Sequence, residues 1–93
     1  MNKEEARALA AVELEKYRKK SYRELVKLID EPENREVVGS SGIKYQLEIN
    51  ALWDDKPNGV LRVMSAIGDD GITAYVPLCD DFLIAPNGKF VDE

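Results

Sequence analysis

Several residues that commonly carry enzyme chemistry are missing or scarce in this 93-residue chain. It has no histidine, which excludes histidine-based triads, histidine-ligated zinc and the commonest general base near neutral pH. Cys79 is the only cysteine, so neither an intrachain disulfide nor a cysteine cluster for a metal can form. We expect Cys79 to be a small core residue, because Asp80 and Asp81 follow it and nearby carboxylates disfavour a thiolate.

Long apolar runs are missing as well. No stretch approaches the roughly 20 apolar residues of a membrane-spanning helix, and the first residues lack a signal-peptide pattern. We therefore expect a cytoplasmic protein with no membrane contact. The length suits one domain over residues 1–93, and 44% hydrophobic with 33% charged residues is an ordinary globular composition.

Charge is divided unequally along the chain. Residues 1–31 carry eight Lys or Arg and seven Asp or Glu, whereas residues 32–93 carry five and eleven. Such an acidic surface repels phosphate backbones, which disfavours nucleic-acid binding. The one basic stretch, Lys16 to Arg23, suits the end of a helix, where cations complement the macrodipole.

The first third of the chain has helical periodicity. Residues 3–20 are mostly good helix formers, and apolar residues recur at three- and four-residue spacing from Ala6 to Tyr17. Ser21 and Glu24 match a capping box, so a second helix can begin there and must end before Pro32. One continuous helix bent near Ser21 is the alternative.

After Pro32 the hydrophobic period changes to two, which is typical of strands. Residues 43–53 alternate apolar and polar side chains, as expected of a strand with one buried face. Pro-Asn-Gly turns follow at Pro57 and Pro86, and we expect Gly59 to take the positive φ of the first turn. The expected strands are 35–38, 43–53, 60–67, 72–78 and 82–85.

These elements predict an α+β fold. A helix or helix pair over residues 1–31 would pack on a four- to five-stranded antiparallel meander over residues 35–91. The periodicity leaves open whether the helices cover one face of the sheet or both.

Strand 60–67 is apolar on both faces. Beside the face that should join the core, a second face carries Val60, Met64 and Ala66 around Arg62, and Tyr75 could extend it. We predict that Val60, Met64, Ala66 and Tyr75 form an interface with a protein partner or a second copy. A helix or terminal segment lying over this face would explain it equally well.

Paired aspartates at 54–55, 69–70 and 80–81 are the other conspicuous feature. They fail the spacing of a calcium loop and suit turns beside glycine, so we expect no metal and no cofactor. The loop of Trp53, Asp54 and Asp55, with Arg62, is a candidate binding loop. Trp53 itself ends the alternating strand on its apolar side and would equally suit the core.

Several motifs together resemble a group of short bacterial proteins of unknown function. They are Ser21-Tyr22-x-Glu24-Leu25, Gly39-x-Ser41-Gly42, Trp53-Asp54-Asp55-Lys56-Pro57-x-Gly59 and Pro77-Leu78-x-Asp80-x-Phe82. The resemblance implies a bacterial cytoplasmic origin and assigns no activity, cofactor or catalytic residue.

Two functional hypotheses follow. The first is a small non-enzymatic binding or regulatory module that acts through a protein partner or self-association. The second is a small enzyme that uses carboxylates and Arg62, with Tyr45 or Tyr75 in a pocket between helix and sheet.

Overall fold

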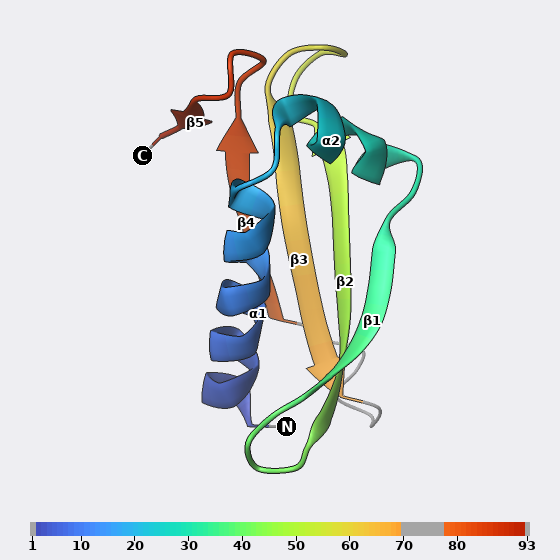
Figure 1. Cartoon of the computed structure of the whole chain (residues 1–93), viewed down its shortest axis with the longest axis vertical. Coiled ribbons are helices and arrows are strands. Elements are labelled where there is room, and N and C mark those ends of the chain that lie inside the picture. The colour runs from blue at the N-terminus through green and yellow to red at the C-terminus, as the bar shows by residue number, and fades with distance from the viewer. Residues whose placement is uncertain (1, 70–77, 93) are drawn as a thin grey trace.

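The computed structural model describes residues 2–69 and 78–92, and it confirms the predicted α+β fold (Figure 1). One short connection, residues 30–32, joins the helical N-terminal part to an antiparallel sheet, in which the five strands of the described residues lie in chain order. The elements are α1 (Lys3–Arg18), α2 (Tyr22–Val26), the 3-10 turn η1 (Lys27–Ile29), β1 (Glu33–Val38), β2 (Lys44–Trp53), β3 (Leu61–Asp69), β4 (Leu78–Ile84) and β5 (Phe90–Val91).

Side-chain caps define where the two helices begin. The Asn2 Oδ1 atom accepts a hydrogen bond from the Glu5 N–H at 3.0 Å, which fixes the start of α1. The predicted capping box is confirmed, because Ser21 Oγ accepts from the Glu24 N–H and the Glu24 carboxylate accepts from the Ser21 N–H. The chain therefore forms two helices and not one bent helix.

The residue with the positive φ in the first Pro-Asn-Gly turn is not the one that was predicted. The Gly59 N–H donates to the Lys56 carbonyl at 3.1 Å, but the positive φ of 67° belongs to Asn58. Asparagine tolerates the left-handed backbone region better than most other non-glycine residues. The prediction that Gly59 takes the positive φ was therefore wrong. In the second turn the glycine does take the positive φ, at 85° for Gly88.

The strand pattern of the C-terminal third also needed correction. Asp80 and Asp81, predicted as turn residues, lie inside β4, which runs unbroken where a break before Phe82 was expected. β3 continues to Asp69, two residues beyond the prediction, and pairs there with Tyr45. Part of the expected hairpin at 68–71 lies outside the described residues. Almost all of the expected strand 72–78 lies outside them as well. β5 was not predicted.

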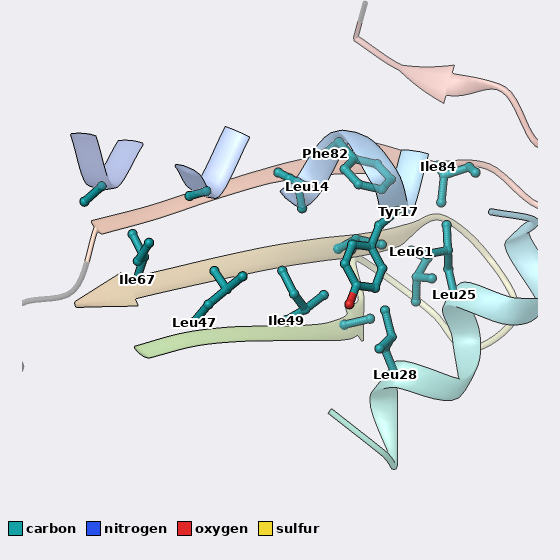
Figure 2. Close-up of a cluster of buried hydrophobic side chains, with 14 of the residues drawn as sticks. Leu14, Tyr17, Leu25, Leu28, Leu47, Ile49, Leu61, Ile67, Phe82 and Ile84 are labelled. Atoms are coloured by element: carbon teal, nitrogen blue, oxygen red, sulfur yellow. The ribbon is translucent and has the colours of Figure 1, made fainter. Parts of the chain in front are cut away.

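The core lies between the helices and one face of the sheet (Figure 2). Figure 1 shows α1 running lengthwise beside β3 and in front of β4, with α2 at the end of the sheet where β3 begins. Both helices contribute to one continuous cluster, which answers the question left open by the sequence: they cover the same face. Its buried apolar members are Ala6, Ala10, Leu14, Tyr17, Leu25, Leu28, Tyr45, Leu47, Ile49, Ala51, Leu61, Val63, Ile67, Phe82 and Ile84.

Candidate binding surface on the open sheet face

The sheet face opposite the helices is the candidate working surface. Side chains alternate along a strand, so each residue next to a core residue in β2, β3 or β4 points away from the helices. No helix among residues 2–69 and 78–92 covers this face, which we call the open face. The strand register assigns to it Gln46, Glu48, Asn50, Leu52, Arg62, Met64, Ala66, Cys79, Asp81, Leu83 and Val91.

Two of the four predicted interface residues lie together on the open face. Met64 and Ala66 are neighbours on β3 and both are partly exposed. Val60 directly precedes β3, is partly exposed, and its carbonyl accepts a hydrogen bond from the Asp54 N–H at 2.9 Å. Tyr75 lies outside the described residues.

An ion triad centred on Arg62 stands beside this apolar pair. Arg62 Nη2 lies 2.7 Å from Asp54 Oδ1 and Nη1 lies 2.5 Å from Asp81 Oδ2. The hydrogen bonds to Asp54 and then to Asp81 raise the pKa of Arg62 above its ordinary value. The guanidinium therefore stays charged, and both of its ends are held in place by carboxylates.

The predicted binding loop is only partly assembled. Asp54 and Arg62 do meet, but the second partner of Arg62, Asp81, comes from β4 and was not predicted. Trp53 lies on the opposite side of the sheet, paired with Leu61 and packed partly against the core. Asp55 is exposed in the turn after β2. The triad thus replaces the predicted loop as the polar feature of this surface.

Apolar side chains flank the triad across the strands. Leu52 on β2, Arg62 on β3, Leu83 on β4 and Val91 on β5 are directly paired in one row. Leu52 is 43% exposed, whereas Leu83 and Val91 are half-buried. In the next row, Met64 lies between Asn50 and Asp81. The open face therefore combines apolar side chains with charges that are held in place.

Asn50 adds an unsatisfied group to the margin of this surface. Its Nδ2 atom donates to Glu48 Oε1 at 2.9 Å, while its Oδ1 atom is buried and has no hydrogen-bond partner within the described parts of the chain. Buried acceptors of this kind usually have a donor, so Asn50 is an exception to the general pattern.

Cys79 is exposed, which contradicts its predicted place in the core. Phe82 and Ile84 point toward the helices, and the alternation of β4 then turns Cys79 to the open face. The prediction was wrong because it used the average burial of cysteine and not the register of the strand.

Among the described residues, those assigned to a hypothetical enzyme site do not converge on a cleft. Tyr45 is fully buried, and its hydroxyl donates to Glu5 Oε1 at 3.0 Å. One cleft, of about 220 Å³ beside α2, is bordered instead by Tyr17, whose hydroxyl donates to Glu33. Burial, and then the bond to Glu33, raises the pKa of Tyr17 to about 12, so it stays protonated near neutral pH.

Comparison with known proteins identifies no relative: no family model, curated protein or solved structure matches the chain. Among the described residues, no helix combines the length and the apolar character needed to cross a membrane.

Proposed function

We propose that this chain is a small non-enzymatic binding module that docks a protein partner on its open sheet face. The observation that carries the proposal is the contrast across the sheet: both helices pack on one face, while Met64, Ala66 and Leu52 remain partly exposed on the other. Exposed apolar side chains gathered on one face, bordered by charges, are typical of a protein-interaction surface.

The charge of the open face favours a foreign, cationic partner over a second copy. Acidic side chains outnumber basic ones on this face or beside it, with Glu36, Glu48, Asp54 and Asp81 against Lys44 and Arg62. The whole chain has a net charge of −5. Two copies meeting face to face would bring like charges together, whereas a surface with Lys or Arg beside apolar residues would be attracted.

The Arg62 triad would fix the orientation of that partner. Because Arg62 holds Asp54 and Asp81 from either side, their carboxylates are ordered before binding and lose little further freedom. A cationic side chain of the partner can then pair with Asp81 while an apolar neighbour covers Met64.

The enzyme hypothesis receives less support. Asp54 and Arg62 are hydrogen-bonded to each other and Glu48 is hydrogen-bonded to Asn50, so these groups already have partners on an open sheet surface.

The proposed location of the protein is the cytoplasm of a bacterium. A single cysteine suits such a reducing compartment.

Site-specific crosslinking tests the proposal. A photo-crosslinking residue replaces Met64 in one variant and, as the matched control, replaces Val12, an exposed apolar residue on α1. In the producing cell we expect a discrete crosslinked protein from position 64 only, and its loss when Asp81→Lys is added. The purified partner should then bind the wild type less tightly as salt is raised.

The other outcomes count against the proposal. Equal products from both positions, or none from position 64, would remove the open face as the working surface. A product with the mass of two chains, together with a concentration-dependent mass in light scattering that Met64→Asp abolishes, would replace the foreign partner by self-association.

A further inference from the structure

A second surface gathers cations from two elements. A cleft of about 370 Å³ lies between the C-terminal half of α1 and β1, on the helix side of the sheet and thus away from the open face. This volume is within the roughly 300–1,000 Å³ of small-molecule sites. Its lining consists of Lys16, Tyr17, Lys19, Lys20, Glu33 and Arg35. Four of these six residues are cations and one is a carboxylate, in a chain of net charge −5.

We propose that this cleft binds a small phosphorylated molecule through a diphosphate-like group. Lys16 lies in the last turn of α1, Lys19 is its C-cap residue and Lys20 follows directly, so all three lie at the C-terminal end of the helix. Complementing the helix dipole would explain these three, but it does not explain Arg35, which comes from β1. The convergence of cations from helix and strand on one cleft therefore points to an anionic ligand.

Arg35 is held in position for such a contact. Its Nη2 atom lies 2.8 Å from Glu13 Oε1 and 3.4 Å from the Tyr17 hydroxyl, while 43% of its side chain remains exposed. Glu13 also holds Lys16, with Oε2 2.6 Å from the Lys16 Nζ atom. Glu13 is itself buried, so it holds Arg35 and Lys16 in position at the rim and does not occupy the cleft.

A phosphate group suits this arrangement better than a single carboxylate does. Arginine can donate two parallel hydrogen bonds to phosphate oxygens, and lysines contribute point charges that a compact multivalent anion can share. Tyr17 is buried and its hydroxyl already donates to Glu33, so the cleft offers no exposed ring on which a nucleobase could stack. The recognised chemistry is therefore the phosphate and not a base.

Amide NMR titration with inorganic pyrophosphate at low salt tests the site. We expect saturable shifts at residues 16–20 and at Arg35, with an affinity that falls about three- to fivefold for each lysine removed, as for exposed ion pairs. The test variant is Lys16→Gln/Lys19→Gln. The matched control, Lys3→Gln/Lys56→Gln, also removes two lysine charges, but at positions away from the cleft. Unchanged amide spectra and melting temperatures show that both variants fold.

The two double variants distinguish binding at the cleft from nonspecific attraction by positive charge. A comparison with an oligonucleotide distinguishes a small phosphate compound from a nucleic acid. Absence of saturable shifts, or equal weakening in the two double variants, would overturn the proposal. So would a single-stranded oligothymidine that shifts the same amides where pyrophosphate shifts none, because the phosphate would then be that of a nucleic acid. None of these outcomes affects the open face, which is tested separately.

Discussion

The two faces of strand β3 contain similar side chains and differ in what covers them. Leu61, Val63 and Ile67 are at most 1% exposed beneath the helices, whereas Met64 and Ala66, one position out of phase, are partly exposed. Hydrophobicity alone therefore does not decide burial in this sheet. The position of α1 and α2 decides it, so the covered face should carry the stability and the open face should be available for binding.

The largest expected effect comes from truncating the covered face. Ile49→Ala removes a fully buried side chain from β2 and should lower the free energy of unfolding by about 2–5 kcal/mol, because it leaves a cavity. Total stabilities of small domains are only about 5–15 kcal/mol, so the variant should be close to unfolding. Urea denaturation followed by circular dichroism measures the difference.

Met64→Ala is the control for this comparison. On a face without a covering helix, it should cost less than about 1 kcal/mol. A loss as large as that of Ile49→Ala would mean that the open face is packed in the free protein, and the proposed docking surface would then be wrong.

A smaller effect is expected at the polar margin of the covered face. Arg35→Ala removes the strand partner of buried Glu13 and leaves only Lys16 to neutralise it. Because Arg35 is 43% exposed, solvent screening reduces the loss to about 1–2 kcal/mol. A double-mutant cycle with Glu13→Gln isolates the coupling of the pair. Coupling near zero would show that this contact does not help to hold α1 against β1.

Glu5 fastens the other end of α1, and its contribution should depend on pH. The Ser41 hydroxyl donates to Glu5 Oε1 at 2.6 Å and the Tyr45 hydroxyl donates to the same atom. The Ser41 bond foremost lowers the pKa of Glu5 below its ordinary value of 4.5. This stabilisation is present above pH 4.5 and is lost as pH falls through the lower folded pKa. Denaturation below pH 4.5 should thus show a shallower pH dependence in Glu5→Gln, but not in Glu4→Gln.

Gly39 offers an independent way to break the same contact. A Cβ atom at this position would overlap the Glu5 carboxylate, so Gly39→Ala should displace that side chain from the loop. The pH dependence of Gly39→Ala should then resemble that of Glu5→Gln, and combining the two changes should add little. Full additivity would indicate that the glycine is needed for some other reason.

Local patterns in the sequence predicted most of the fold, and distant contacts explain what was missed. The alternation of β2 and the capping box of Ser21 depend on neighbouring residues, so they could be recognised directly. The partnership of Arg62 with Asp81 spans 19 positions and depends on the β3–β4 register, which no local pattern specifies. The alternation of β3 was enough to place Met64 on the face opposite the core residues. The position of the helices depends on contacts between distant residues, so the sequence could not show that the face of Met64 would remain uncovered.

The smallest expected effect has the opposite sign and lies at the centre of the covered face. Ser65 is 1% exposed, and its Oγ atom has no hydrogen-bond partner in the described parts of the chain. A buried hydroxyl without a partner loses its hydration with nothing in return, so Ser65→Ala should leave stability unchanged or raise it by up to about 1 kcal/mol. Thermal unfolding of the wild type and variant side by side is the measurement. A clear loss would show that the hydroxyl does have a donor or acceptor in solution, and the covered face would then be more polar than its contacts indicate.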